Sequence, residues 1–273
     1  MDKKNRIRYW VETLPKKGKN VFTLEEITQQ FPMINAMNIR NTLYRLSRKG
    51  IIQSVWHGFY VIIPVDYGLK GIVPPTEYID QLMRYLGKEY YVGLLNAAAF
   101  HGAAHQQPQE FTVVVNDKNL RGRTKKGVKI NFITRFDLPT PYIKQLNTRS
   151  GYILISSAEL TAMDLTFYIK EIGGINRAAT VLNELAETMD FQNIKDDFLG
   201  YFSSAVIQRL GYILEEVVGY KELAETLYQK AKKTKIKFRK YPLKVVGKET
   251  DLGGYDTNEK WKIIINEEIE IDE

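Results

Sequence analysis

The chain has 273 residues, of which 44% are hydrophobic, 26% charged and 12% aromatic, and it contains no cysteine. This composition is typical of a globular protein with a sizeable core, and the length suggests two domains. The lack of cysteine excludes a disulfide scaffold, a cysteine nucleophile and thiolate metal sites. The charged first residues and the short apolar runs predict neither a secretory signal nor a membrane span, so we expect a cytoplasmic protein.

The net charge of +7 is unevenly distributed. Residues 1–64 contain eleven Lys/Arg and four Asp/Glu and therefore carry +7, whereas the remaining residues contain 28 of each sign. A basic excess confined to one quarter of the chain indicates a polyanionic partner for that quarter. A basic surface that is merely solvated is the alternative interpretation.

The first 63 residues show the pattern of three helices followed by a β-hairpin. Thr23 and Glu26 have the spacing of a capping box, which marks the start of a short helix that Pro32 ends. Gly58 follows His57 at a position where a tight hairpin turn is expected. The predicted helices are residues 2–14, 24–31 and 36–49, and the predicted strands are 51–56 and 59–63.

The third predicted helix combines a buried stripe with a polar and basic face. Ile39, Leu43 and Leu46 recur at helical spacing, and the other face presents Asn38, Arg40, Asn41, Tyr44, Arg45 and Arg48. Arg and Asn pair with base edges, while Tyr and Arg also reach phosphates. Lys16 and Lys17 in the adjoining loop and His57 at the hairpin tip are further candidate DNA-binding residues. We therefore predict a winged helix-turn-helix DNA-binding domain over residues 1–66. A winged helix used only for protein contacts is the alternative.

Residues 67–273 are predicted to form a larger mixed domain after a hinge at Pro64–Pro75. The fold class is α+β: an N-terminal winged helix-turn-helix followed by a larger mixed α+β domain. The predicted helices are residues 76–86, 91–104, 175–189 and 206–217, and the predicted strands are 111–115, 128–133, 152–155, 243–246 and 262–265.

Charge is segregated within this second part of the chain. Residues 118–149 sum to +8, and residues 150–220 sum to −6. A run of four cations, Arg121, Arg123, Lys125 and Lys126, follows a predicted strand and is a candidate second basic surface for phosphates. The same run could form a solvated hairpin tip or meet an acidic partner.

Patterns that support catalysis are missing from the sequence. The acid-x-Lys triplet of a restriction-type nuclease occurs only at Asp2–Lys4, no two aspartates have the spacing of a nucleotidyltransferase, and there is no phosphate-binding glycine loop. His101 and His105 could share one helix face, but zinc needs three or four ligands. Hydrogen bonds to nearby backbone are the simpler role for these histidines. We predict no catalytic residues, no metal and no cofactor.

The order of these motifs resembles the AbiEi-type antitoxins and related regulators of bacterial abortive-infection systems. The similarity lies in Arg45–Ile52 with Gly58–Tyr60, Tyr91–Gly102 leading into Glu110–Val115, Ser157–Asp164, and Arg209–Glu215. The resemblance implies a type IV antitoxin whose N-terminal domain represses its own operon at inverted repeats in duplex DNA. It also implies that the C-terminal region counteracts a nucleotidyltransferase toxin.

The resemblance spans residues 6–220 and leaves the role of residues 221–273 open. Two other functions remain as alternatives at this stage. One is a winged-helix transcription factor whose C-terminal domain senses a small ligand. The other is a nuclease that a winged helix targets to DNA.

Overall fold

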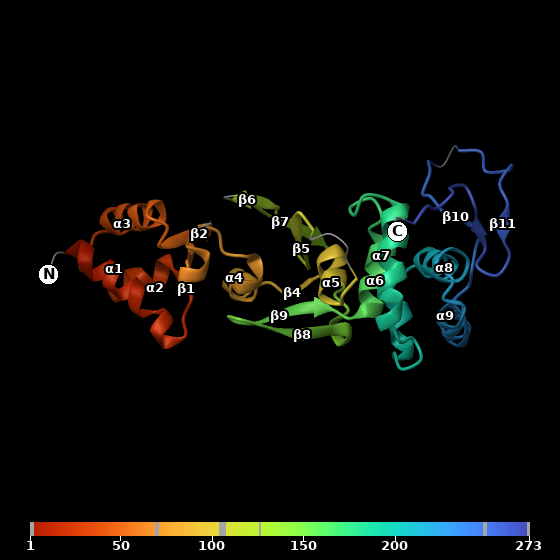
Figure 1. The fold of residues 1–273 in the computed structure, drawn as a ribbon, viewed down its shortest axis with the longest axis horizontal. Helices are drawn as coiled ribbons and strands as arrows, with labels where there is room; N and C mark the ends of the chain where they lie inside the picture. Colours follow the sequence, from red (N-terminus) through yellow and green to blue (C-terminus); the bar gives the residue numbers. More distant parts are fainter. Residues whose placement is uncertain (1–2, 69–70, 104–107, 126, 248–249, 272–273) are drawn as a thin grey trace.

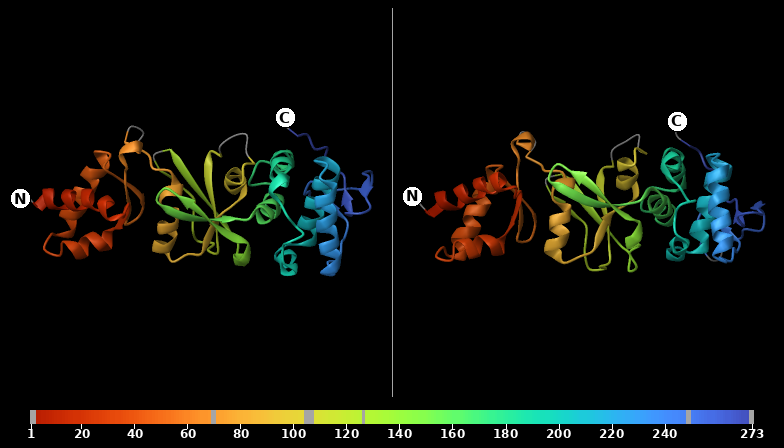
Figure 2. Two further views of the ribbon diagram at one scale, coloured as in Figure 1. Left: turned by 60° about the horizontal axis from the view of Figure 1, so that its bottom comes forward. Right: turned by 90° about the horizontal axis from the view of Figure 1, so that it is seen from below.

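The structure is a computed structural model that describes residues 3–68, 71–103, 108–125, 127–247 and 250–271. The chain is elongated, and its parts follow one another along the long axis in sequence order (Figures 1 and 2). An N-terminal unit lies at one end and a mixed β-sheet lies in the middle. Helices and a small C-terminal sheet form the other end (Figure 1).

The N-terminal unit contains helices and strands at the segments where the sequence predicts them. Its elements are α1 (Lys3–Thr13), β1 (Val21–Thr23), α2 (Leu24–Gln30), α3 (Ala36–Arg48), β2 (Ile52–Trp56) and β3 (Phe59–Ile62). Thr23 caps α2 as expected, since its Oγ1 accepts from the Glu26 amide at 3.1 Å and its own amide donates to the Glu26 carboxylate at 2.9 Å. Strand β1, which was not predicted, extends the hairpin into an antiparallel sheet of order β1-β3-β2.

A mixed sheet forms the centre of the molecule. The elements of this region are α4 (Ile79–Leu86), β4 (Tyr90–Val92), α5 (Leu94–Phe100), β5 (Glu110–Val115), β6 (Arg123–Lys125), β7 (Val128–Thr134), β8 (Ile143–Thr148) and β9 (Gly151–Ser156). The strand order is β6-β7-β5-β4-β9-β8, with parallel pairing of β5 with β7 and of β4 with β9. The hairpins β6–β7 and β8–β9 thus form the two edges.

The two faces of this sheet pack against different parts of the chain. Val113 and Val115 share an apolar cluster with α4 and with residues of the β2–β3 hairpin. Val114 and Tyr91 join the cluster of α5, α6 and the helices beyond them. Because successive residues of a strand point to opposite faces, this alternation places the N-terminal unit and the later helices on opposite sides of the sheet (Figure 1).

The helix predicted over residues 91–104 is wrong at its start. Residues 90–92 form the central strand β4, and α5 begins only at Leu94, whose φ of 53° follows the break at Gly93. A strand that is covered on both faces has no alternation of polar and apolar residues. Its short apolar run therefore cannot be distinguished by pattern from the buried helix that follows it.

The second half of the chain is mostly helical. Its helices are α6 (Ala158–Phe167), α7 (Ile175–Leu185), α8 (Ser204–Tyr212) and α9 (Lys221–Lys233), and a π-helical turn at Ile213–Val217 follows α8. Helix α6 is central, because every residue from Ala158 to Thr166 is buried. Ser157 begins α6 by accepting a hydrogen bond from the Leu160 amide at 3.2 Å.

A small C-terminal sheet packs on α8. Its strands are β10 (Tyr241–Pro242), β11 (Thr257–Asn258) and β12 (Ile263–Ile264). The strand predicted at residues 243–246 is wrong: Leu243 is buried as a single anchor, whereas Val245 is 50% exposed. The ring of Trp261 lies so close to α8 that a Cβ at Gly211 would meet it at 2.1 Å. Residue 211 must therefore be glycine.

A buried ion pair joins the sheet to the helices. The Asp164 carboxylate in α6 is fully buried, and it accepts from the Arg135 guanidinium at 2.7 Å and from the Tyr91 hydroxyl at 2.7 Å. The guanidinium also donates to the Tyr201 carbonyl at 3.0 Å and lies 4.7 Å from the ring centre of Phe202. Strand β4, the end of β7, α6 and the segment before α8 thus meet at one carboxylate.

Burial raises the pKa of Asp164 to about 6, while Arg135 and the hydrogen bond from Tyr91 act in the opposite direction. Asp164 is therefore mostly ionised at neutral pH, and the charge on Arg135 balances it. A buried carboxylate is tolerated only when such partners replace the water that it loses.

Replacing Arg135 with Met is expected to lower the free energy of unfolding by about 3–5 kcal/mol, because the Asp164 carboxylate stays buried without its cation. The loss should be larger at pH 8 than at pH 5. Without Arg135 the folded-state pKa of Asp164 rises further above its unfolded value, and a raised carboxyl pKa removes stability as the pH rises through it. Urea denaturation at both pH values measures this difference.

The double variant Arg135→Met/Asp164→Asn should recover much of the loss and show little dependence on pH. Arg149→Met is the matched control, since its partner Asp66 is exposed and water screens that pair. Equal losses in Arg135→Met and Arg149→Met would contradict the role given to the buried pair.

Candidate nucleic-acid interface

Helix α3 is fixed in the N-terminal unit by its cap and by one apolar stripe. The Asn35 side chain accepts from the amides of Met37 at 2.8 Å and Asn38 at 3.2 Å, which starts the helix. Ile39, Leu43 and Leu46 are buried in the core of the unit. The opposite face of α3 is therefore held in a defined orientation toward solvent.

All of the side chains of α3 that are predicted to bind DNA lie exposed on this outer face: Asn38, Arg40, Asn41, Tyr44, Arg45 and Arg48. Tyr44 is 64% exposed. Within the described chain, no carboxylate forms an ion pair with Arg40, Arg45 or Arg48. Part of the face is hollowed into a shallow depression of about 520 Å³, lined by Asn41, Tyr44, Arg45, Arg48 and Lys49. The face thus presents donors and positive charge to a partner.

The three other candidate DNA-binding residues are also exposed. Lys16 and Lys17 lie in a 3-10 turn after α1. His57 lies at the tip of the β2–β3 hairpin, and its carbonyl accepts from the Tyr85 hydroxyl of α4 at 3.1 Å. The tip is therefore covered on one side by the second part of the chain.

The predicted basic run forms one strand of an edge hairpin that packs on β2. The Arg123 guanidinium lies 4.1 Å from the ring centre of Trp56, which also makes an edge contact with Phe132 at 6.0 Å. Lys125 donates to the Ser54 hydroxyl at 3.1 Å. Arg121 is exposed, and Lys126 lies outside the described residues. Arg123 and Lys125 thus contact β2, while the three residues of β6 remain exposed on the surface.

The β2–β3 hairpin contributes to the core between the N-terminal unit and the sheet. Val55, Phe59 and Val61 are buried with α4 and with the sheet, and Phe59 contacts the Tyr85 ring at 5.4 Å between ring centres. At the other sheet edge, the Asn20 amide donates to the Ser150 hydroxyl at 3.4 Å. These contacts fix the orientation of α3 relative to the sheet.

The histidine expected to bond to backbone does so. A ring nitrogen of His101 lies 2.8 Å from the Ser156 carbonyl oxygen, while His105 lies outside the described residues. Among the residues that the structure describes, no group of three or more His, Asp or Glu side chains could hold a metal ion. No helix in this part of the chain has the length and apolarity to cross a membrane.

Comparison with known proteins identifies the central part of the chain. Residues 91–216 match the family model of the AbiEi antitoxin C-terminal domain. The chain carries an AbiEi antitoxin domain. This match confirms the resemblance drawn from the sequence over residues 91–216.

Most of the chain also shares its fold with a solved structure. A crystal structure of the RV2827C protein from Mycobacterium tuberculosis superposes with a TM-score of 0.62 at 15% identity, covering 93% of this chain and 89% of that one. At this identity the likeness concerns the fold alone. A search of curated proteins gives no match.

The AbiEi domain contains the buried ion pair and most of the sheet. Tyr91 and Asp164, which lie in two of the stretches that carry the resemblance, are joined there by a hydrogen bond. Gly211, in the last of these stretches, is the position covered by Trp261. Sequence reasoning missed the Arg135–Asp164 pair, because the two residues are far apart in the chain and nothing local couples them.

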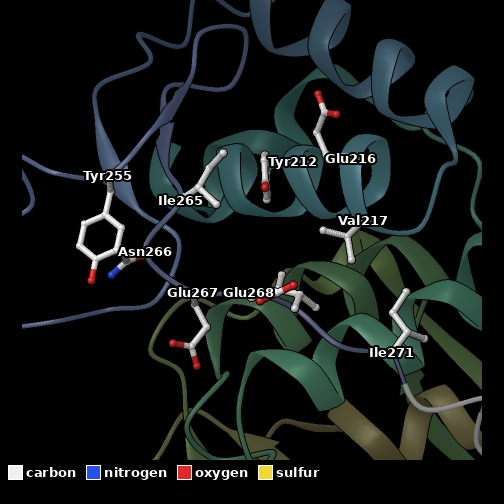
Figure 3. Close-up of a pocket in the computed structure, with 10 residues that line it drawn as sticks. Tyr212, Glu216, Val217, Tyr255, Ile265, Asn266, Glu267, Glu268 and Ile271 are labelled. Carbon is white, nitrogen blue, oxygen red and sulfur yellow. The ribbon is translucent and has the colours of Figure 1, made fainter.

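An open cavity of about 820 Å³ lies at the end of the AbiEi domain. Figure 3 shows Tyr212, Glu216 and Val217 on the helical side, with Ile265 to Ile271 of the C-terminal segment crossing opposite them. Its lining is apolar and acidic, without a cationic side chain among the lining residues. The cavity is therefore poorly suited to a phosphate-bearing ligand.

Replacing Trp56 with Ala is expected to lower the free energy of unfolding by about 2 kcal/mol, because the ring loses its contacts with Phe132 and Arg123. Tyr44→Ala is the matched control, since that ring is exposed on α3 and should change stability little. Thermal and urea denaturation of both variants test this. Equal stability of Trp56→Ala and the wild type would mean that the β6–β7 hairpin does not pack on β2 in solution.

Proposed function

We propose that this protein is a DNA-binding transcriptional repressor and antitoxin. The observation that carries the proposal is the exposed face of α3, whose arginines have no carboxylate partner within the described chain, on a protein that contains an AbiEi antitoxin domain. A repressor needs an exposed basic face to bind DNA. An antitoxin that binds the promoter of its own operon can regulate its own expression.

In this proposal the N-terminal unit is a winged helix-turn-helix domain of residues 1–66. Helix α3 is the recognition helix and enters the major groove of duplex DNA, where Arg and Asn side chains read base edges. Lys16, Lys17 and His57 contact phosphates beside it. Arg121 and Arg123 extend the basic surface next to the hairpin, which is the wing.

The partner of the AbiEi domain is, in this proposal, a nucleotidyltransferase toxin encoded in the same operon. The protein counteracts the toxin through residues 67–273 and represses the operon promoter at inverted repeats through residues 1–66. The family match supports the antitoxin role, and the toxin class comes from the sequence resemblance. A toxin reading frame next to this gene would support it further.

Binding to DNA from the upstream region of the operon should weaken linearly on a plot of log affinity against log salt, because phosphate contacts release counterions. Arg45→Ala is expected to cost roughly 1–3 kcal/mol of binding free energy and to relax the sequence preference. Lys17→Ala should weaken binding evenly across sequences and lower the salt slope by about 1. Fluorescence anisotropy with specific and scrambled duplexes measures both effects.

Lys170→Ala removes an exposed lysine far from α3 in the chain and serves as the control for charge. Binding that does not respond to salt, or equal binding by Arg45→Ala and Lys170→Ala, would reject the recognition-helix assignment.

The two activities should separate in the full-length protein. With Arg40, Arg45 and Arg48 all replaced by Gln, cells that express the neighbouring toxin should still grow, while a reporter on the operon promoter becomes derepressed. The physical reason is that these side chains are exposed on α3, whose buried stripe packs in the separate core of the N-terminal unit. Growth assays and reporter activity at matched protein levels provide the measurement.

Arg135→Met, which destabilises the AbiEi domain, is the converse control and should lose protection. If the α3 triple variant fails to protect cells although it is folded and abundant, the proposed division between the two domains is incorrect.

A further inference from the structure

A second concentration of positive charge lies beyond the AbiEi match, at the end of α9. Residues 230–240 contain seven Lys/Arg in eleven positions and no acidic residue. Six of these cations are exposed and together form what we call the basic strip: Lys232, Lys233, Lys235, Lys237, Arg239 and Lys240. The strip and α3 lie near opposite ends of the molecule (Figure 1).

Local structure accounts for the cations within α9 itself. Lys233 pairs with Asp196 at 2.7 Å, and Lys232 lies 4.4 Å from the ring centre of Tyr228. Cations in the last turn of a helix are also stabilised by the helix dipole. These factors do not extend past the end of α9, so the cations that follow need another explanation.

Lys235, Lys237 and Arg239 have no ion-pair partner among the described residues. They alternate with Ile236 and Phe238, which are half-buried and pack on the helical core. Phe238 stacks on Trp261 with 5.8 Å between ring centres. The alternation places one positive charge on the surface at every second residue.

The backbone that carries these charges is held firmly. The Gln208 side chain, fully buried in α8, donates to the Arg239 carbonyl at 2.6 Å and accepts from the Arg239 amide at 3.3 Å. The Ile236 amide closes the end of α9 by donating to the Ala231 carbonyl at 3.0 Å. A fixed backbone reduces the conformational entropy lost when the strip binds a partner.

Lys235 occupies a backbone position that favours glycine. Its φ is 58°, in the left-handed region that ends many helices and where glycine is the usual residue. A lysine here keeps its charge at the expense of backbone strain. Strain retained at one residue is typical of positions that serve a function other than folding.

We propose that the basic strip binds the phosphate backbone of a nucleic acid without regard to sequence, as a site separate from α3. Protein interfaces depend on desolvated apolar and aromatic anchors and are poor in lysine. The strip instead directs its apolar side chains into the core and offers regularly spaced cations, which suits a chain of repeating negative charges.

The test uses the full-length protein with Arg40, Arg45 and Arg48 replaced by Gln, so that α3 contributes little. In this background the strip variant carries Lys235→Gln, Lys237→Gln and Arg239→Gln. The probes are a labelled 20-nucleotide single-stranded RNA and a 20-base-pair duplex DNA, both of scrambled sequence. The strip variant should bind the preferred probe about tenfold more weakly at low salt, and its salt slope should fall by about 2 on the single strand.

The matched control replaces the exposed Lys170, Lys195 and Lys221 by Gln, which removes the same charge elsewhere. The control should keep the affinity of the background protein, and the probe that binds more tightly identifies RNA or DNA as the ligand. Equal losses in the two variants, or no binding by the background protein, would overturn the proposal. So would a change of oligomeric state in light scattering with unchanged affinity, because the strip would then bind the acidic C-terminal segment of a second copy.

Lys235→Gly separates binding from folding at a single residue. It should raise the melting temperature, because glycine relieves the left-handed backbone, and should also weaken binding to the probe. A higher melting temperature with unchanged affinity would overturn the role given to Lys235. These results do not depend on the function proposed for α3, because Arg40, Arg45 and Arg48 are replaced by Gln in every protein of the test.

Discussion

The buried carboxylate of Asp164 is the constraint on which the arrangement of the AbiEi domain depends. A charge with no exposed surface must have its water replaced by partners in good geometry. Arg135 and Tyr91 supply them from the end of β7 and from β4. Because Asp164 lies in α6, Tyr91 and Arg135 must both lie on the side of the sheet that faces α6. Tyr91 and Asp164 lie in separate stretches of the family resemblance, and this hydrogen bond joins the two stretches in the fold.

A second constraint ties the N-terminal unit to the sheet. The outer side chains of the β2–β3 hairpin, Val55, Phe59 and Val61, are buried against α4 rather than exposed. Trp56 is held between Phe132 and Arg123 from the edge hairpin. The polar face of α3 remains open, because its buried stripe faces the separate core of the unit. A partner that binds α3 therefore meets a surface whose orientation relative to the AbiEi domain is already set.

The sequence predicted the elements whose signals are local. The spacing of Ile39, Leu43 and Leu46 predicted the helix α3 and its buried side. The remaining side of the helix was therefore expected to be exposed. Strand β4 was missed because full burial removes alternation, and β8, from Ile143 to Thr148, because its edge position leaves few apolar residues. The Arg135–Asp164 pair depends on tertiary contacts that no local pattern encodes.

The basic strip was missed for another reason. Over residues 221–273 as a whole, the acidic residues near the end of the chain balance the cations near α9. The excess of positive charge is evident only when residues 230–240 are considered alone. A charged surface segment is thus detected in the sequence only when the charge is counted over the residues of that segment.

The C-terminal segment shows how a part of the chain outside the family match becomes part of the same fold. Trp261 covers Gly211, donates its indole N–H to Glu215 at 2.6 Å, and receives a hydrogen bond at its carbonyl from Gln208 at 2.6 Å. Gln208 uses the same amide group to hold Arg239. The contacts that bury Trp261 therefore also fix the backbone of the basic strip. Because one buried glutamine serves both segments, the surface position of the strip follows from the packing of the core.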